Sequence, residues 1–241
     1  MPQHIYATVE DVLHGLADYF VAQAGAAIAA RGRFSVALSG GSSPKKLYEL
    51  LASKTYREKV DWKQVFFFFG DERDVPLTDP ESNFLMAKTA LLDPLHIAPA
   101  HVFAVNTLLP PTEAAQAYTT AIETFFSPAE AQFDLVLLGL GDNSHTASLF
   151  PHTAVLSVAT ASAQAVFVKE KQIYRITLTA PLINQAHAVA FLVYGADKAA
   201  AVQSVVNGER NIEEFPAQLI APKESELNWF LDEAAAGNLA H

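Results

Sequence analysis

Four short, almost wholly apolar runs constrain the fold of this chain most strongly. They are FSVAL at 34–38, VFFFF at 65–69, FDLVLLGL at 133–140 and AVAFLVYG at 188–195. Apolar and polar residues do not alternate along them, which indicates strands that are buried on both faces of a sheet. Strands of this kind are typical of parallel sheets, whose successive strands are joined by crossover connections.

Segments with a helical pattern separate these strands. Residues 8–31 predict a long helix, with Thr8 and Asp11 as a start resembling a capping box and Gly32 after its end. Further helices are predicted at 44–53, 82–92, 112–126, 197–207 and 223–236. Other strands are predicted at 102–105, 165–170 and 174–179, with an antiparallel pair as one arrangement of the last two. This alternation favours an α/β fold with a mostly parallel central sheet flanked by helices, in three Rossmann-like layers.

Length and composition limit the classes of protein. The 241 residues fit one domain over 1–241 better than two small ones, and a hydrophobic content of 51% allows a sizeable core. A net charge of −10 argues against binding to nucleic acid or to a membrane surface, although a local basic cluster can still bind a small anion. The absence of cysteine excludes disulfides, Cys-based zinc sites and thiol catalysis.

The first residues, MPQHIYATVEDV, contain neither a basic segment nor a long apolar one, so a signal peptide is not expected. No run of about 18 apolar residues predicts a membrane span. We therefore expect a cytoplasmic protein.

A glycine- and serine-rich loop, SGGSS, follows the strand at 34–38, and Pro44 is expected to open a helix behind a serine N-cap. Its glycines allow close approach of a ligand, and a helix start offers free N–H groups. The loop therefore predicts an anion cradle that suits phosphate, although it lacks the Walker A and Rossmann spacings. Arg175 and Lys198 could complete the cradle. An ordinary strand–turn–helix with a serine cap and two surface charges is the alternative.

A dense group of charges, Asp71, Glu72, Arg73 and Asp74, comes directly after the strand at 65–69. Charges set against an apolar wall orient one another and shift pKa values, as in many active sites. The alternative is a solvated turn with a local ion pair. The position beyond a buried strand favours the site, because ligands of parallel sheets bind there.

The third loop, GLGDNSHTASLF, contains His145 five residues after Leu140. We expect Ser144 or Thr146 to cap a helix that begins at TASLF. A helix N-terminus lowers the pKa of a nearby imidazole, which would suit His145 as a general base. A metal site with His152 or Asp142 is the alternative, but no third ligand and no His-x-x-x-His pair is present, so no metal is expected.

Four motifs occur in order along most of the chain: LSGGSSP, GDERDVP…SN, GLGDNSHTASLFP and RITLTAPLIN…VAFLVYGADKA. Together with WFLDEAAA near the C-terminus, they resemble the 6-phosphogluconolactonases of the glucosamine-6-phosphate isomerase/6-phosphogluconolactonase family. The resemblance implies an α/β fold shared with glucosamine-6-phosphate deaminases. It also implies hydrolysis of 6-phospho-D-glucono-1,5-lactone in the oxidative pentose phosphate pathway, without cofactor or metal.

The resemblance assigns two groups of site residues. The group expected to bind the substrate phosphate consists of Gly41, Ser42, Ser43, Arg175 and Lys198. The group expected to be catalytic consists of Asp71, Arg73, Asn143 and His145, with His145 as the general base. The implied partner is a small phosphosugar lactone, and we expect a monomer or a small homo-oligomer that binds neither nucleic acid nor membrane.

This chain departs from the family pattern just before the histidine. The family usually has Asp-Gly where this chain has Asn143-Ser144, and an amide cannot stabilise an imidazolium as a carboxylate does. Loss of such a carboxylate costs a catalytic triad several orders of magnitude, although a lactone needs less help than an amide. Asp142 or Asp71 could serve instead, and the serine suggests a different local backbone.

Two alternative functions remain open at this point. One is a glucosamine-6-phosphate deaminase/isomerase, although HTASLFP fits the lactonases better. The other is a sugar-phosphate sensor without catalysis, for which Asn143 is the best support.

Overall fold

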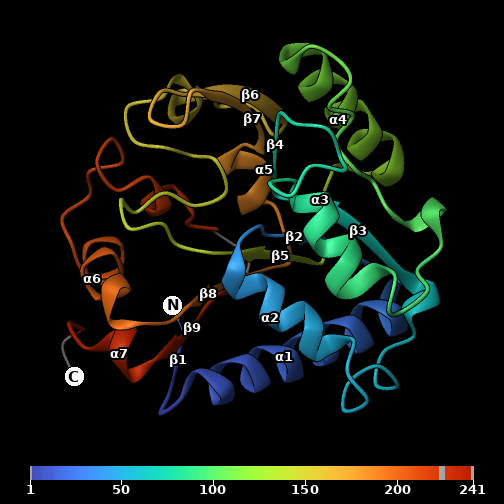
Figure 1. Cartoon of the computed structure of the whole chain (residues 1–241), viewed down its shortest axis with the longest axis horizontal. Coiled ribbons are helices and arrows are strands. Elements are labelled where there is room, and N and C mark those ends of the chain that lie inside the picture. Colours follow the sequence, from blue (N-terminus) through green and yellow to red (C-terminus); the bar gives the residue numbers. More distant parts are fainter. Residues whose placement is uncertain (1, 223–225, 240–241) are drawn as a thin grey trace.

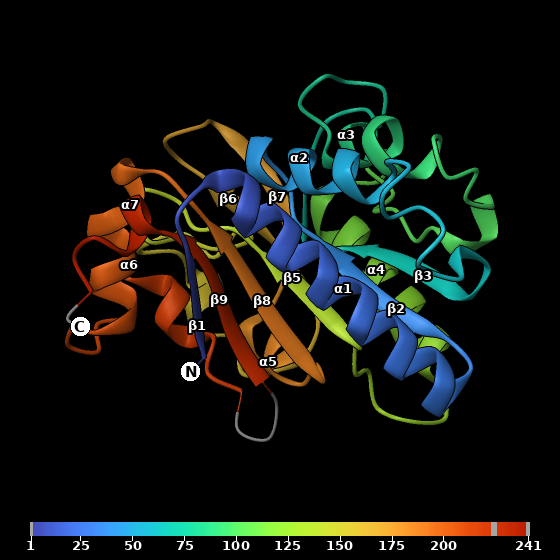
Figure 2. The same cartoon turned by 90° about the horizontal axis from the view of Figure 1, so that it is seen from below.

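The computed structural model describes residues 2–222 and 226–239. Its large sheet has six strands, all paired in parallel, in the order β1-β9-β8-β5-β2-β3 (Figure 2). Their bounds are β1 (Gln3–Tyr6), β2 (Phe34–Leu38), β3 (Val65–Phe69), β5 (Leu135–Leu138), β8 (Ala188–Val193) and β9 (Glu226–Asp232). The prediction of a mostly parallel central sheet is confirmed.

Helices cover both faces of this sheet. The α-helices are α1 (Val9–Arg31), α2 (Ser42–Leu51), α3 (Asn83–Ala87), α4 (Pro111–Phe126), α5 (Ala180–Asn184), α6 (Ala199–Val206) and α7 (Glu233–Ala236). A π-helix, η2 (Lys88–Leu92), continues α3. The 3₁₀ helices are η1 (Trp62–Gln64), η3 (Pro99–His101), η4 (Ala154–Ser157), η5 (Ala196–Lys198) and η6 (Pro216–Leu219).

The uniformly apolar strands supply two hydrophobic cores. In β3, the side chains of Phe67 and Phe69 join the core that contains α1 and α2, whereas Phe68 joins the core that contains α4. Because successive side chains of a strand point to opposite faces, a strand between two cores must be apolar at every position. Figure 1 shows α1 and α2 on one side of the sheet and α4 on the other.

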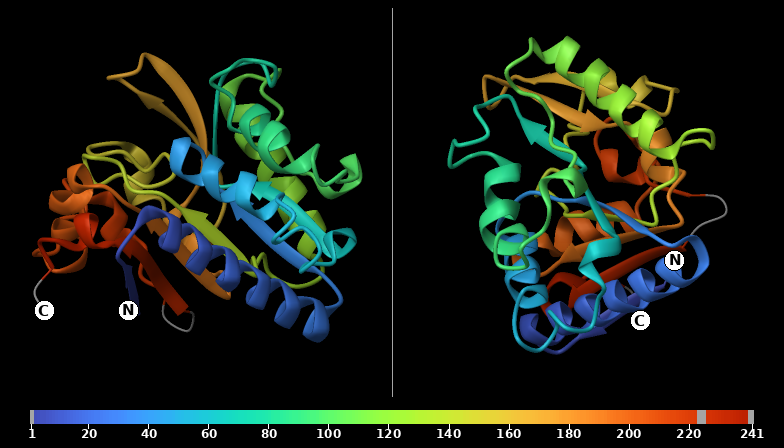
Figure 3. Two further views of the ribbon diagram at one scale, coloured as in Figure 1. Left: turned by 60° about the horizontal axis from the view of Figure 1, so that its bottom comes forward. Right: turned by 90° about the vertical axis from the view of Figure 1, so that its right-hand side faces the viewer.

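A second, three-stranded sheet lies on the α4 side of the molecule. It consists of β4 (Asp71–Arg73), β7 (Ile173–Leu178) and β6 (Ala163–Val168), paired antiparallel in the order β4-β7-β6. The left view of Figure 3 shows the β6–β7 hairpin (tan) standing out from the body. The antiparallel arrangement of the two predicted strands is confirmed. The charged segment Asp71–Arg73 is an edge strand of this sheet rather than the solvated turn considered as the alternative.

Helix α1 begins and ends as the sequence predicts. The side chain of Thr8 accepts a hydrogen bond from the Asp11 N–H at 3.1 Å, and Gly32 adopts a left-handed conformation with φ of 74°. By length and composition alone α1 could cross a membrane. In this structure, however, one face of α1, including Leu16 and Phe20, is buried against the sheet, as in the core helix of a globular protein.

Two predictions in the middle of the chain are wrong or incomplete. Residues 102–105 do not form a strand: a single bridge joins Val102 to Phe67, and the chain then leaves the sheet edge. The helix predicted at 82–92 is divided into α3 and η2.

The helix predicted at 223–236 is wrong over most of its length. Residues 223–225 lie outside the described part of the chain, residues 226–232 form β9, and only the short α7 is helical. Strand β9 inserts between β1 and β8, where Trp229 and Leu231 are buried. Pairing with two neighbours outweighs the local helical preference of this segment. The edge strand β1 was not predicted.

Candidate functional site

A cavity of about 540 Å³ opens at the carboxyl ends of β2, β5 and β8. The chain leaves β2 toward β3 on one side, whereas β5 lies on the other side of β2, so the strand order reverses there. Open α/β sheets bind their ligands at such a reversal. The residues assigned from the sequence that line this cavity are Gly41, Ser42, Ser43, Asp71, Arg73, His145, Arg175 and Lys198.

The loop after β2 forms one wall of the cavity. Helix α2 begins at Ser42 rather than at Pro44, and its N-cap is Gly41 rather than a serine. The φ of 106° at Gly41 is a conformation that favours glycine, and no side chain caps the helix. The first N–H groups of α2, at Ser42 and Ser43, therefore have no side-chain acceptor and are suited to an anion.

Contacts with α2 and α3 hold this loop in place. The Tyr48 hydroxyl donates a hydrogen bond to the Ser39 carbonyl at 2.8 Å. A Cβ atom at Gly40 would lie only 2.0 Å from Oδ1 of Asn83, the first residue of α3. Position 40 therefore requires glycine, because the loop packs directly on α3.

Two arginines lie side by side on the opposite wall. Arg73 of β4 is paired in register with Arg175 of β7, and both Nε atoms are buried without a hydrogen-bond partner in the described part of the chain. The Arg73 Nη1 atom donates to the Glu81 carbonyl at 2.5 Å, and the Arg175 Nη1 atom lies 3.7 Å from the Asp71 carboxylate. Burial, together with the charge of Arg73, lowers the pKa of Arg175. Unpaired buried donors and adjacent like charges are both unfavourable, so an anion fits this wall.

The two acidic residues of this strand have different surroundings. Glu72 is fully buried and accepts hydrogen bonds from the N–H groups of Arg73, Asn83 and Phe84. Burial raises the pKa of Glu72, and these hydrogen bonds act in the opposite direction. Glu72 thus anchors the start of α3, whereas Asp71 lines the cavity.

His145 lies in a loop rather than before a helix. Residues 146–150 form no helix, and a bridge joins Thr146 to Leu149 instead. The His145 ring is half-buried, and its pKa is nevertheless lowered to about 4, chiefly by desolvation. Asp71 acts in the opposite direction, and Arg175 and Lys198 lower the pKa further. The ring stacks on Phe150 with centroids 4.1 Å apart. The prediction of a low pKa agrees with the structure, but the predicted cause, a helix N-terminus, is wrong.

Asn143 determines which ring nitrogen of His145 carries the proton. The Asn143 Oδ1 atom lies 3.3 Å from the His145 backbone N–H and 2.5 Å from Nδ1. A backbone N–H can only donate, so the oxygen of the amide must face the histidine. Nδ1 is therefore the protonated nitrogen, and Nε2 keeps the lone pair that a general base needs.

Ser144 adopts the left-handed conformation, with φ of 59°. Glycine takes this conformation without strain, whereas a serine carries some strain in it. Two hydrogen bonds hold it, from its own N–H to the Gly141 carbonyl and from the Ala217 N–H to its carbonyl, both at 2.9 Å.

Lys198 follows β8 in η5 and forms an ion pair with Asp142, the residue before Asn143. Its Nζ atom also lies 3.9 Å from the Asp197 carboxylate. Asp142 is therefore engaged by Lys198, whereas Asn143 is hydrogen-bonded to the His145 ring.

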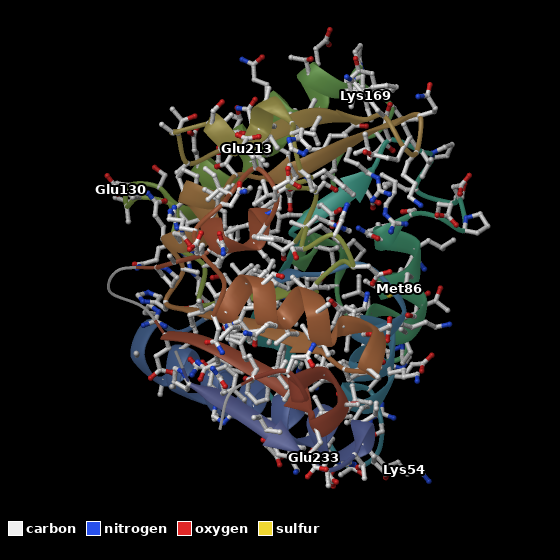
Figure 4. The ribbon with its side chains drawn as sticks, turned by 90° about the vertical axis from the view of Figure 1, so that its left-hand side faces the viewer. Lys54, Met86, Glu130, Lys169, Glu213 and Glu233 are labelled. Atoms are coloured by element: carbon white, nitrogen blue, oxygen red, sulfur yellow. The ribbon has the colours of Figure 1, made fainter. Side chains whose placement is uncertain are left out.

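The partners considered for a metal site are engaged elsewhere. The His152 ring contacts Glu213, labelled in Figure 4, and Glu214, with Nε2 of the ring 3.1 Å from the Glu214 carboxylate. Within residues 2–222 and 226–239, no three His, Asp or Glu side chains are close enough to hold a metal ion.

Sequence reasoning missed two buried residues that contact Asp71. Ser148 donates to Asp71 Oδ2 at 2.5 Å, and Asn83 donates to Asp71 Oδ1 at 3.1 Å. Both lie inside the motifs that carry the family resemblance, HTASLF and the final SN of the second motif. Because these contacts join residues far apart in the sequence, no local pattern indicates them.

Comparison with known proteins gives consistent results. A family model described as glucosamine-6-phosphate isomerases/6-phosphogluconolactonase matches residues 7–229. A 6-phosphogluconolactonase of Synechocystis sp. is 44% identical over 218 residues, which cover 88% of each chain. The structure of the 6-phosphogluconolactonase from Trypanosoma brucei superposes with a TM-score of 0.84 at 30% identity, over 99% of this chain and 98% of that chain.

A monomeric glucosamine-6-phosphate deaminase also superposes, with a TM-score of 0.84 over 99% of this chain and all of that chain. At 19% identity, this likeness concerns the fold alone. The expected resemblance to the deaminase fold is confirmed.

Proposed function

The chain belongs to the glucosamine-6-phosphate isomerase/6-phosphogluconolactonase family, and we propose that it hydrolyses 6-phospho-D-glucono-1,5-lactone to 6-phosphogluconate in the oxidative pentose phosphate pathway. One observation carries the proposal beyond the family. A histidine whose Nδ1 is bound by Asn143, so that Nε2 keeps the lone pair, lines the same cavity as two arginines whose Nε atoms have no partner among the described residues. A general base and an anion-binding wall are what hydrolysis of a phosphorylated lactone requires.

The substrate phosphate binds at the open start of α2. Ser42 and Ser43 supply N–H and hydroxyl donors, and Arg175 and Lys198 supply charge. Lys198 exchanges Asp142 for the phosphate when the substrate binds. Binding of the remote phosphate holds the lactone ring in register with His145, so that binding energy is converted into orientation.

Hydrolysis then proceeds by general-base catalysis. Nε2 of His145 takes a proton from water, and the resulting hydroxide attacks the ring carbonyl. Arg73 or N–H groups of the loops stabilise the oxyanion. The protonated His145 returns its proton to the ring oxygen as the bond between that oxygen and the carbonyl carbon breaks. A pKa of about 4 keeps His145 in its base form at neutral pH.

The alternative of a glucosamine-6-phosphate deaminase is not favoured. The relative with 44% identity is named a lactonase, whereas the likeness to a deaminase concerns the fold alone. An assay of both substrates with the same preparation separates the two functions.

Replacement of the proposed base tests the mechanism. We expect His145→Ala to lower kcat by about 10²- to 10⁴-fold with little change in KM, because the general base acts in the transition state. The measurement is lactone hydrolysis with the spontaneous rate subtracted. His152→Ala, at an exposed histidine outside the cavity, is the matched control.

Turnover of His145→Ala near the wild-type rate would remove His145 from this role. Binding of 6-phosphogluconate by the wild type without any acceleration of hydrolysis would favour a sensor instead.

We also propose, from the sequence, that the protein is cytoplasmic and is a monomer or a small homo-oligomer that binds neither nucleic acid nor membrane. Light scattering of the purified protein measures the oligomeric state.

A further inference from the structure

The carboxylate of Asp71 is held from two sides by residues with no role in the mechanism above. The Ser148 hydroxyl donates to Oδ2 at 2.5 Å. The Asn83 side-chain amide donates to Oδ1 at 3.1 Å and to the Asp71 backbone carbonyl at 2.8 Å. Ser148 is 0% exposed and Asn83 is 3% exposed, so water does not compete for these bonds. With one donor on each oxygen, the carboxylate cannot rotate freely.

The two donors come from different walls of the site. Ser148 lies three residues after His145, and its N–H donates to the Thr177 hydroxyl of β7 at 3.1 Å. Thr177 is the register partner of Asp71 across the β4–β7 pair. Ser148 therefore joins the loop that contains His145 (residues 139–150, the histidine loop) to β4 and β7, the strands that carry Arg73 and Arg175 and form the arginine wall.

Asn83 makes the corresponding connection to the loop after β2 (residues 39–43), the proposed phosphate loop. Its Oδ1 atom lies where a side chain at Gly40 would be, and its N–H donates to Glu72 at 2.8 Å. Asp71 is thus the point at which the histidine loop, the arginine wall and the support of the phosphate loop meet.

We propose that Ser148 and Asn83 are positioning residues that fix the Asp71 carboxylate, so that its negative charge stabilises the imidazolium of His145 during proton transfer. The proposal rests on the proposed function of the same site. It assigns to Asp71 the part that a carboxylate next to the histidine would otherwise have.

The charges around His145 explain why this charge must come from Asp71. Asn143, which is hydrogen-bonded to the ring, is neutral, and Asp142 is paired with Lys198. The positive charges of Arg175 and Lys198 disfavour an imidazolium, and Asp71 is the largest opposing charge. A carboxylate free to turn toward Arg175, now 3.7 Å away, would give up part of that effect.

A double-mutant cycle in the full-length protein tests the proposal. We expect Ser148→Ala to lower kcat for lactone hydrolysis by about 10- to 100-fold with KM little changed, because a misplaced charge acts on the transition state. If Ser148 acts through Asp71, the double variant Ser148→Ala/Asp71→Asn is no slower than Asp71→Asn alone. If instead the double variant loses the product of the two single losses in kcat, Ser148 has a merely structural role and the proposal is overturned.

Ser35→Ala is the matched control, because Ser35 forms the same kind of buried bond, 2.8 Å to Asp134 Oδ2, outside the cavity. We expect it to lower the melting temperature but not kcat. If Ser148→Ala does not fold, Asn83→Ser is carried through the same cycle. A kcat for the folded variant no lower than that of Ser35→Ala would overturn the proposal. The wild-type rate tests the proposed function separately, since it does not depend on any variant.

Discussion

At the scale of single residues, the surroundings of His145 separate two tasks that one carboxylate often combines. Asn143 orients the ring and fixes its tautomer through Oδ1, but it supplies no charge. The sequence showed that the usual aspartate is absent. It could not show that the amide oxygen still reaches Nδ1, because this depends on the turn that Gly141 and Ser144 form. A side chain at Gly141 would collide with the ring, with only 2.0 Å between its Cβ and Nδ1.

Restoring the carboxylate separates orientation from charge. In Asn143→Asp we expect the pKa of His145 to rise from about 4 by about 1–3 units, because an adjacent negative charge favours the imidazolium. Since the proposed mechanism uses the neutral ring as the base, we expect the acid limb of the kcat/KM profile to move to higher pH by the same amount. The pH–rate profile checks the shift, with Asn106→Asp as the control.

Asn106 is a suitable control because its side chain also accepts a backbone N–H two residues later, that of Leu108, outside the cavity. The change in net charge is the same. An acid limb that stays in place in Asn143→Asp would contradict the assigned contact with Nδ1.

At the scale of elements, predictions succeeded where local sequence and burial agree. The strands at 34–38 and 65–69 were predicted with their observed bounds, since an unbroken apolar run has few alternatives. The segment at 226–232 failed because its strand conformation comes from two partners distant in sequence, β1 and β8. Helix α2 begins earlier than predicted, since Gly41 rather than a serine turns the chain into it.

The support of the phosphate loop by α3 gives a prediction at this scale. In Gly40→Ala the new methyl group meets Asn83, so we expect a loss of about 1–3 kcal/mol in stability and a higher KM for the lactone. Denaturant unfolding and steady-state kinetics measure the two effects.

Gly25→Ala is the matched control on α1, where a Cβ atom would meet nothing within 4 Å. There the same change should stabilise the protein by about 0.5–1 kcal/mol, because alanine favours a helix interior, and leave KM unchanged. Equal KM values for Gly40→Ala and the wild type would show that the loop does not depend on this contact.

At the scale of the whole molecule, the half-buried His145 links stability to pH. The pKa of His145 is about 4 in the folded protein, against an ordinary value of 6.5 in the unfolded chain. Between these values the unfolded chain binds a proton that the folded protein does not. The stability from the neutral, half-buried ring is therefore complete above about pH 6.5 and is lost as the pH falls toward 4, by up to about 3 kcal/mol.

Comparison with His145→Asn isolates this contribution. We expect the free energy of unfolding of the wild type to fall more steeply than that of the variant between pH 6.5 and pH 4.5. Urea unfolding at a series of pH values measures both slopes, and contributions common to the two proteins cancel. Parallel slopes would mean that His145 titrates alike in the folded and unfolded states.

That residues 1–241 form one domain stays a prediction.

The sequence by itself determined the fold class, the family and the loops that carry chemistry, because apolar runs and motifs are local and can be recognised along the chain without the structure. All of the site residues predicted from the sequence, except Asn143, line the cavity. Only the tertiary structure decided that Arg73 lies beside Arg175 in the neighbouring strand and that Asn143 contacts the His145 ring. It alone also showed that Ser148 and Asn83 hold Asp71. These contacts join strands, loops and helices far apart in the chain, and their geometry is set by strand register and packing rather than by any neighbouring residue.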